Sequence, residues 1–441
     1  MITGQTSTAS RGILPRREAQ RPVLALMGHL RRAGAVVAPI DVHYPSGGFR
    51  GIRAASAIRS GAPILSIPLS SLLTTDVARA STIGRAITDS GAALDSTHSL
   101  IAAFLLQERL DPRSSFWPYL DSLPISFATF PLFFGEDDLA LLEGSMTVAK
   151  IEARRASIQH DDDALRAAVP MFRRFSSASF LRARITVTSR IFGLTIAGQK
   201  TEALVPLADM LNHREPPETH WTYDDEAGAF VMTALRSFAV GEPIHDSYGR
   251  KCNSRFFLSY GFALEDNEDN EAIVRLGPSA RAFQISTRPD DDRAREALSF
   301  LRTACATESE LSAALGTETL PLNARNESAA LRALAAACES ALAAFPTTLD
   351  EDDTLLAEGR LSPRARLCII QRRGEKRVLR AWIDLVVEAL PFLRLPWERL
   401  VQTTRERSGN RHVDRHLHSI VSALTERRRA ERAAIREGVS R

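Results

Sequence analysis

The chain has 441 residues, which is enough for two or three domains that each bury a core. Its composition, 44% hydrophobic and 25% charged, is that of a soluble globular protein, and a net charge of +3 is too small to favour nucleic-acid binding. No run reaches the roughly 18 apolar residues that a membrane span needs. The four cysteines lack the spacing of a disulfide framework or a Cys-rich zinc site. We therefore expect a reducing compartment, cytoplasmic or nuclear, with a plastid or other organelle left open.

The N-terminal third combines a terminal segment, a helix and short strands. Residues 1–22 are rich in Ser, Thr and Arg with a single acid, Glu18, and we expect a flexible segment there, with a transit peptide as the alternative. Residues 23–33 have helical spacing. From 47 to 75 apolar and polar residues alternate between glycines, which predicts short strands.

The middle of the chain changes to helical periodicity. The run THSLIAAFLLQERL at 97–110 predicts a buried helix, and a second helix is expected from Asp137, behind the acidic turn GEDD. From about 150 to 195 the period is mainly helical. These residues form a helical insert between two strand-rich blocks.

The second strand-rich block covers about 203–248. It contains a predicted hairpin whose turn lies around Asp224 to Gly228, and a short helix is expected at 254–262. After about 290 the chain is helical by composition and period, and its end, TERRRAERAAIREGVSR, predicts a solvated basic helix. The fold class is therefore α+β, with an all-helical C-terminal domain.

Polar and aromatic residues are densest at 204–262. LVPLADMLNH places Asp209, Asn212 and His213 at the end of an apolar segment; one interpretation is a short helix that Asn212 caps, with Asp209 and His213 solvated. Tyr248 and Tyr260 flank a glycine turn and the helix after it, where two phenols can hydrogen-bond a polar substrate atom. Ordinary core roles of the two tyrosines are the alternative. The residues alone do not choose between a functional and a structural interpretation of this region.

Other chemistries lack their usual signals. The histidines and the acid of the C-terminal tail are interpreted as a chance cluster without a convincing further ligand, so we expect no metal site: His412, Asp414, His416 and His418. The chain has no glycine-rich phosphate loop between a strand and a helix and no GxSxG elbow. Nucleotide hydrolysis and serine-hydrolase chemistry therefore have no support.

Four segments in order resemble one family, the SET-domain methyltransferases related to RuBisCO large-subunit lysine methyltransferase and to the actin-histidine methyltransferase. They are GGFRGIRAASAIRSGAPILSIPLSSLLTT (47–75), FWPYLDSLP (116–124), LVPLADMLNH through SYGRKCNSRFFLSYGFALEDNEDN (204–270) and FPTTLDEDDTLLAEGRLSPRARLCIIQRRGEKRVL (345–379). With the spacing between them they span about residues 45–395.

The resemblance implies a domain layout. It places a SET domain, small β-sheets around a knot-like core, at 23–270, and a helical insert at about 95–195 divides it. A helical substrate-binding domain like that of the RuBisCO methyltransferase is expected at 285–425, followed by a basic helical tail at 426–441. The acidic stretch LEDNEDNE (264–271) is interpreted as an exposed loop, with attraction of a basic substrate segment as the alternative.

The resemblance also implies S-adenosylmethionine as the cofactor. The backbone near Gly51 and Arg53 would lie against it, and Arg190 would meet its carboxylate, a pairing that suits guanidinium geometry. The remaining cofactor residues that the resemblance implies are Asn212 and His213 at the adenine end, Asp209 close by and Phe262 packed beside the cofactor. The opening motif GGFRGIRA is one residue longer than the commoner arrangement, which bears on the assignment of Arg53.

The implied activity is protein-lysine N-methylation. Tyr260 matches the tyrosine that aims the substrate nitrogen, and Tyr248 matches a second aromatic residue of the same channel. The histidine-directed member has a smaller residue at the position of Tyr260, which favours lysine here. A protein-histidine methyltransferase and a catalytically silent binding module remain the alternatives. The expected partner is a protein substrate docked by the helical C-terminal domain of a monomer, with neither nucleic acid nor membrane.

Overall fold

The structure, a computed structural model, describes residues 16–43, 50–288, 291–314, 320–407 and 409–439. The chain divides into two compact units, and each is described by itself. The first unit consists of Met1–Phe127 and Arg155–Arg250, and the second of Ala128–Arg154 and Lys251–Arg441. None of the helices in the described ranges is long and apolar enough to cross a membrane.

The first unit begins with α1 (Arg16–Arg32). Val23, Leu26 and Leu30 recur at helical spacing and are each 1% exposed, so the helix forms because it buries one apolar face. It packs against α5 (Trp117–Ser122). The helix predicted from residue 23 therefore starts earlier: residues 16–22, expected to be flexible, are helical, whereas 1–15 lie outside the described residues.

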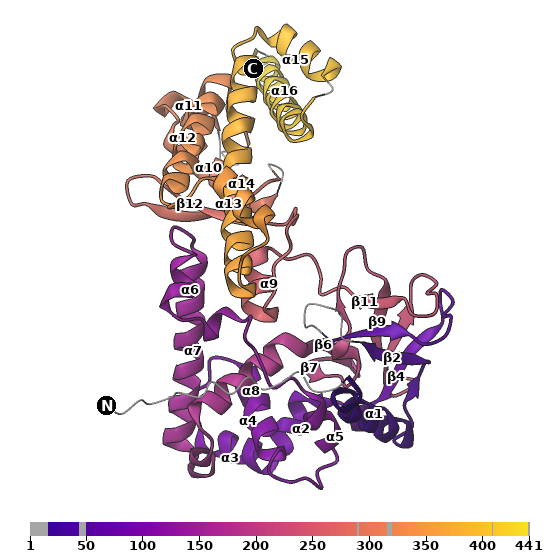
Figure 1. Cartoon of the computed structure of the whole chain (residues 1–441). Helices are drawn as coiled ribbons and strands as arrows, with labels where there is room; N and C mark the ends of the chain where they lie inside the picture. The colour runs from indigo at the N-terminus through magenta and orange to yellow at the C-terminus, as the bar shows by residue number, and fades with distance from the viewer. Residues whose placement is uncertain (1–15, 44–49, 289–290, 315–319, 408, 440–441) are drawn as a thin grey trace. The chain divides into compact units, whose positions relative to one another are not determined.

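Three small sheets form the strand-rich part of the first unit, and Figure 1 labels strands of all three together. The first has the order β1 (Val36–Val37), β4 (Pro63–Pro68), β10 (Ala229–Ala234) and β9 (Thr219–Asp224). The second has the order β2 (Ile40–His43), β3 (Gly51–Ala54), β11 (Pro243–Asp246) and β8 (Asn212–His213). The third has the order β5 (Leu73–Thr74), β7 (Gln199–Leu204) and β6 (Ile191–Ile196). The two predicted strand-rich blocks and the β9–β10 hairpin are confirmed; residues 47–49 lie outside the described ranges.

The second sheet joins segments that are far apart in the sequence. Strand β11 pairs antiparallel with β3, with Ile244 opposite Ile52, and parallel with β8, with Asp246 opposite His213. The glycine-containing strand near residue 51 and the LVPLADMLNH segment therefore meet on either side of one central strand. The candidate site residues Gly51 and Arg53 of β3 and Asn212 and His213 of β8 therefore lie in one sheet.

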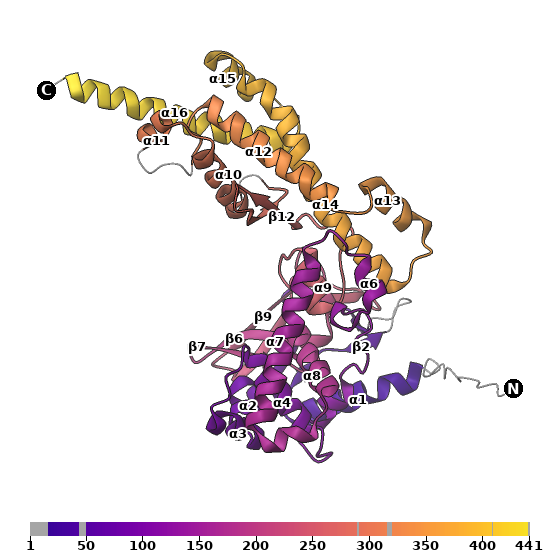
Figure 2. The same cartoon turned by 90° about the vertical axis from the view of Figure 1, so that its left-hand side faces the viewer.

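Helices cover the other part of the first unit, where α2 (Thr75–Ala80), α3 (Thr82–Ser90), α4 (Thr97–Glu108) and α8 (Ser177–Arg190) gather in both views (Figures 1 and 2). Every residue of α4 from Ser99 to Leu106 is buried, which confirms the predicted buried helix. Helix α7 (Thr147–Ala168) and the short η3 (Pro170–Arg174) lead into α8. The helical period predicted to about 195 ends at Arg190, because Ile191 starts the β6–β7 ladder.

The second unit contains the helical C-terminal half of the chain. Its elements are η2 (Pro131–Phe133), α6 (Glu136–Ala140), the start of α7, α9 (Asn253–Tyr260), the hairpin β12 (Glu271–Leu276)–β13 (Arg281–Ser286), α10 (Asp292–Ala304), α11 (Glu308–Ala314), α12 (Ala324–Ala343), α13 (Leu349–Glu358), α14 (Pro363–Leu393), α15 (Trp397–Glu406) and α16 (Arg411–Val439). α12 and α14 pack along each other around Trp382, which is 1% exposed. The helix expected from Asp137 is the five-residue α6, and the hairpin at 271–286 was not predicted.

The acidic stretch 264–271 is paired within the second unit. Glu265 pairs with Arg366 of α14, and Asp266 pairs with Arg377 of the same helix at 3.1 Å. Glu271 is only 10% exposed and lies 2.9 Å from the Lys150 ammonium. The prediction of an exposed loop holds for Asp266, which is 89% exposed, but not for Glu271.

Candidate functional site

The segment 204–213 does not form the capped helix of the first interpretation. After β7 the chain reaches Leu207, a buried non-glycine residue at φ 70°, a conformation that costs energy and that the surrounding structure must enforce. A single turn, η4 (Ala208–Met210), follows and ends at the extended Leu211. Asn212 then enters β8 and is not a helix cap. The parallel pairing with β11 overrides the local preference for a cap.

The Asp209 side chain is buried, contrary to the interpretation that it is solvated. Its side chain is 0% exposed. The Nη1 atom of Arg190, at the end of α8, donates to the Asp209 main-chain oxygen at 2.8 Å and to Oδ2 at 2.9 Å. The hydroxyl of Tyr119, in α5, donates to the same Oδ2 at 2.9 Å. These three side chains, which we call the Arg190 cluster, come from three separate segments of the first unit.

The charges in the Arg190 cluster are well defined. Burial, reinforced by the negative charge of Asp209, raises the pKa of Tyr119 well above its ordinary value, so the phenol stays protonated and donates. Burial acts to lower the pKa of Arg190, but the charge and hydrogen bond of Asp209 outweigh it and raise that pKa. Arg190 Nε and Asp209 Oδ1 are buried without a hydrogen-bond partner in the part of the chain that the structure describes. Since buried polar atoms are normally paired, these two atoms indicate a place for a polar ligand.

Gly51 and Asn212 are in close contact. The Asn212 side-chain amide donates to the main-chain oxygen of Arg50 at 3.2 Å. A Cβ on Gly51 would lie 2.9 Å from Asn212 Nδ2 and 2.9 Å from His43 Cε1, closer than real Cβ atoms approach other groups. Only glycine fits here without displacing these side chains, so the start of β3 is packed closely against Asn212 and His43.

His213 and Tyr248 lie next to each other. The Tyr248 backbone N–H donates to His213 Nδ1 at 3.1 Å, so that ring nitrogen is an unprotonated acceptor. The two rings stack with centroids 5.3 Å apart, and the Tyr248 hydroxyl donates to the Leu211 main-chain oxygen at 2.7 Å. The structure therefore brings Asn212, His213 and Tyr248 together at the β8–β11 pair.

Asp246 is a titratable group of this region that sequence reasoning missed. It ends β11, two residues before Tyr248, and is 3% exposed. Burial raises the pKa of Asp246 to about 6, although the Thr219 hydroxyl donates to its Oδ1 at 3.1 Å. Nothing in the motif SYG indicates this, because the burial depends on the distant strand β9.

Arg53 lies on β3, two residues after Gly51, but its side chain makes a different contact. Its side chain is 44% exposed and pairs with Asp41 at 3.6 Å. Its main chain lies in the ladder between β2 and β11. The arginine side chain is thus exposed to solvent. The prediction that the backbone at Arg53 lies against the cofactor stays a prediction.

Tyr260 and Phe262 belong to the second unit. Helix α9 ends at Tyr260, and Gly261 follows at φ 74°, where a Cβ would lie 2.6 Å from Phe130 Cδ2. The Phe262 ring stacks on Phe256 at 4.9 Å and is tilted against Tyr260 at 6.2 Å. The assignment of Tyr260 and Phe262 to one site with Tyr248 stays a prediction from the sequence motif.

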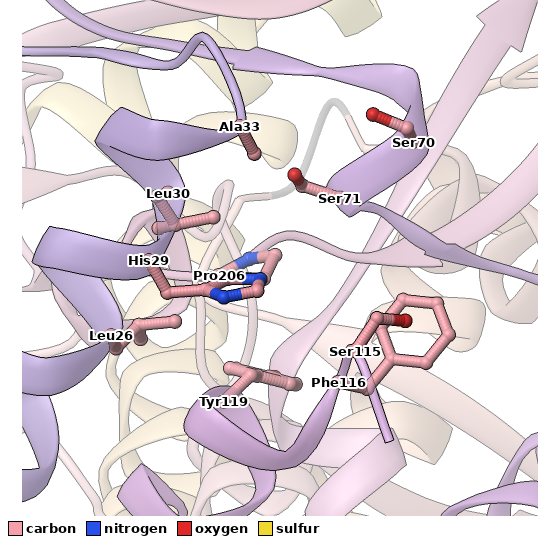
Figure 3. Close-up of a pocket in the computed structure, with 10 residues that line it drawn as sticks. All are labelled: Leu26, His29, Leu30, Ala33, Ser70, Ser71, Ser115, Phe116, Tyr119 and Pro206. Atoms are coloured by element: carbon pink, nitrogen blue, oxygen red, sulfur yellow. The ribbon is translucent and has the colours of Figure 1, made fainter. Parts of the chain in front are cut away.

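A cavity of about 190 Å³ lies next to Tyr119 in the first unit. Leu26, His29 and Leu30 of α1 line one side and face Tyr119 and Pro206 (Figure 3). Tyr119 is thus shared between the cavity wall and the Arg190 cluster.

Potential metal ligands lie elsewhere. Asp95, His160 and Asp161 can converge on one ion, but the buried Asp161 already accepts from the Asp95 backbone N–H at 2.7 Å and from the Ser99 hydroxyl. The tail residues interpreted as a chance cluster make contacts within the second unit; for example, His418 Nδ1 lies 2.7 Å from the Asp414 oxygen.

Comparison with known proteins identifies two domains. Residues 49–249 match the SET domain family, and residues 264–379 match the Rubisco LSMT substrate-binding family. The actin-histidine N-methyltransferase of Papio anubis is 27% identical over 415 residues, covering 84% of this chain and 69% of that protein. The Homo sapiens protein of the same name is 28% identical over 384 residues, covering 77% of this chain and 64% of that protein. The chain thus spans about two thirds of the length of these relatives.

Solved structures show the same fold. The SET domain of LSMT bound to lysine and AdoHcy matches with a TM-score of 0.71 and 22% identity, over 92% of this chain and 100% of that one. Rubisco LSMT bound to AdoMet matches with a TM-score of 0.69 and 22% identity, over 88% and 97%. The predicted α+β fold, a SET domain of small sheets followed by a helical C-terminal region, is confirmed.

Proposed function

Because the chain joins a SET domain to a Rubisco LSMT substrate-binding domain, we propose that it is an S-adenosylmethionine-dependent protein methyltransferase that methylates a lysine side chain. The observation that carries the proposal is the convergence, within the first unit, of the Arg190 cluster with the Asn212–His213–Tyr248 group on the segment 209–213. These are the residue types that the motif assigns to the cofactor and to the channel for the reacting nitrogen.

The residues present fit the cofactor. The glycine at position 51 lets the Asn212 side chain pack directly against the start of β3, which fixes Asn212 for its proposed role. The buried Arg190 Nε has no partner among the described residues, and Arg190 is charged, which suits a carboxylate. Asp209 Oδ1, also without a partner there, suits a donor such as an ammonium group. In the proposal Asn212 and His213 hold the adenine end, while Phe262 and the backbone at Arg53 complete the site.

When bound, S-adenosylmethionine supplies a methyl group on a positively charged sulfur. The chain's own residues have to align and desolvate a neutral nitrogen opposite that methyl. Tyr248 is fixed for this task, since its hydroxyl is held by the Leu211 oxygen and its ring by His213. Aromatic, water-poor surroundings disfavour an ammonium ion and lower the pKa of a lysine, which releases its lone pair. In the proposal Tyr260 orients that nitrogen.

Docking of the protein substrate is assigned to the helical domain at about 285–425. The match of residues 264–379 to a substrate-binding family supports this assignment. The other proposed boundaries are the SET domain at 23–270 with its insert at about 95–195, and the basic tail at 426–441. A monomer working on a separate protein is the simplest arrangement that fits.

Histidine is the second candidate target. The relatives from Papio anubis and Homo sapiens are named actin-histidine N-methyltransferases, which supports an imidazole nitrogen as acceptor. The presence of Tyr260, where the histidine-directed protein has a smaller residue, supports lysine. Tyr260→Phe separates the two: a lysine enzyme loses most of its activity, whereas a histidine enzyme keeps it.

The first test is calorimetric titration of the full-length protein with S-adenosylmethionine, with Arg190→Ala alongside. We expect binding by the wild type and much weaker binding by the variant. Incubation with isotope-labelled cofactor and a lysate, followed by mass spectrometry, then identifies methyl-lysine or methyl-histidine in the product. A folded wild-type protein that binds no cofactor would leave the silent binding module as the better account.

A further inference from the structure

Two hydrogen-bond donors converge on one oxygen of a buried carboxylate. Asp209 Oδ2 accepts from the Tyr119 hydroxyl and from Arg190 Nη1, each at 2.9 Å, and the same Nη1 donates to the Asp209 main-chain oxygen at 2.8 Å. Tyr119 is 2% exposed, and the Asp209 side chain is 0% exposed. The carboxylate therefore has little freedom to rotate or to exchange its partners for water.

This arrangement fixes one edge of the Arg190 guanidinium. Because Nη1 is held at two points, the plane of the group is set by Asp209 and, through it, by Tyr119. Nε remains buried without a partner in the described part of the chain. A planar group anchored along one edge presents its other N–H donors in a fixed direction.

The backbone that carries Asp209 is constrained as well. Leu207, two residues earlier, is held at φ 70° while fully buried. Tyr119 also lines the cavity with Pro206 and with Leu30 of α1 (Figure 3). Strain of this kind persists only where the surroundings over-determine a conformation, which is expected for a group that must be placed accurately.

We propose that Tyr119 and Asp209 are positioning residues that fix Arg190 for a carboxylate, so that the site recognises the amino-acid end of its ligand by directed hydrogen bonds. This inference rests on the proposed function, which supplies the carboxylate-bearing cofactor. Asp209 also balances the charge of Arg190. The ligand is therefore selected by donor geometry more than by net positive charge. Neither residue touches the reacting atoms in this role.

The experiment compares two ligands that differ only in that carboxylate. S-adenosylmethionine and its decarboxylated form are titrated calorimetrically into the full-length wild type, Tyr119→Phe and, as a matched control, Tyr223→Phe. Because the lost hydrogen bond acts on the ligand only through Arg190, we expect an effect of about three- to tenfold in affinity. We expect Tyr119→Phe to bind S-adenosylmethionine weaker by that factor and to bind the decarboxylated ligand as the wild type does. Tyr223→Phe, on β9, should change neither.

The outcomes separate this inference from the proposed function. Equal weakening of both ligands by Tyr119→Phe indicates a general structural role and overturns the inference, as does no weakening of either. A wild type that binds neither ligand overturns the proposed function and the inference with it. If the decarboxylated ligand binds the wild type too weakly to titrate, steady-state kinetics decide. A rise in KM for S-adenosylmethionine at unchanged kcat supports positioning, and a matching fall in kcat overturns it.

Discussion

Each unit buries a cluster of opposite charges, and the two clusters differ in how completely they are paired. In the second unit Asp352 accepts from Arg372 at 2.6 Å through one oxygen and from Lys376 at 2.7 Å through the other. The Lys376 ammonium also donates to Thr347, and Arg372 also donates to the Leu141 oxygen. Asp352 and its two cations have no buried polar atom without a partner among the described residues, whereas the Arg190 cluster has two.

The difference separates a structural use of buried charge from a binding use. A cluster that satisfies all its own atoms ties α13 to α14 and has no donor left to offer. A cluster with unpaired atoms carries a cost in the free protein that a ligand can remove. On this reasoning, damage to the first kind of cluster lowers stability, and damage to the second lowers affinity.

The largest effect is expected at Asp352. Asp352→Asn leaves two buried cations without their anion, and removing one partner of a buried ion pair costs about 3–5 kcal/mol. Hydrogen exchange of the α13 and α14 amides should show the loss of local stability. Asp353→Asn is the matched control: this neighbouring carboxylate is 42% exposed and pairs with Arg373 and Arg377, so about 1 kcal/mol or less is expected. Equal effects of the two variants would contradict the structural interpretation.

Arg190→Lys tests the binding cluster. Lysine keeps a positive charge near Asp209 but cannot hold a carboxylate by two parallel donors. We expect S-adenosylmethionine affinity to fall by about 1.5–3 kcal/mol, the range for hydrogen bonds to charged groups, in calorimetric titration. The thermal midpoint should change much less than in Asp352→Asn. If Arg190→Lys lowered the thermal midpoint as much as Asp352→Asn does but bound S-adenosylmethionine normally, the distinction between the two clusters would be wrong.

Asp246 extends the comparison to pH. Its pKa is raised to about 6 in the folded protein, so the protonated form stabilises the fold below the unfolded value near 3.8, and this contribution is lost as pH rises through about 6. Asp246→Asn has no charge to bury. We therefore expect its free energy of unfolding, relative to wild type, to rise by about 1–3 kcal/mol between pH 4 and pH 7 in denaturant titrations. Glu226→Gln, at an exposed residue, serves as the control. If the difference in unfolding free energy between Asp246→Asn and wild type did not depend on pH, a cost of burying the Asp246 charge would be ruled out.

The smallest effect is expected at the start of α13. Thr348 and Glu351 form a reciprocal capping box, in which the Thr348 side chain accepts from the Glu351 backbone N–H. Thr348→Ala should cost about 0.5–2 kcal/mol, measured as faster hydrogen exchange in the first turn of α13. Thr348→Ser, which keeps the hydroxyl, should restore most of it. A loss as large as that of Asp352→Asn would mean that the cap and the cluster are not independent.

The sequence predicted the helices and most strands because each of these elements repeats its apolar residues at helical or strand spacing within one continuous stretch. The 97–110 helix and the 224–228 turn are examples. The β12–β13 hairpin at 271–286 was missed; it packs within a helical unit, where its strands contact α10, α12 and α14. Composition after residue 290 indicated helices correctly, but the hairpin lies just before that segment.

The site was harder to predict because its geometry depends on distant segments. Motif resemblance identified Arg190, Asn212, His213 and Tyr248. In the structure His213 contacts Tyr248, and Arg190 is connected to this group through the segment 209–213. It did not reveal the burial of Asp209, which needs α5 and α8 to cover it. Tyr119 lay inside the matched run FWPYLDSLP, yet only its hydrogen bond shows what it does. The exposed side chain of Arg53 follows from strand alternation, which was available in the sequence.

The chain enters its second unit twice, first with residues 128–154 and again from 251. The early piece is built into that unit: Thr147 donates to the buried Glu375, and Gly144 lies so close to the Ala344 backbone that a Cβ would be 2.6 Å from it. A chain cut after residue 250 would therefore keep 128–154 without its partners, and the C-terminal fragment would lack part of its core. The two domains recognised by sequence are not separable modules for expression or recombination. During synthesis, residues 128–154 can pack only after Ala344 and Glu375 have been made.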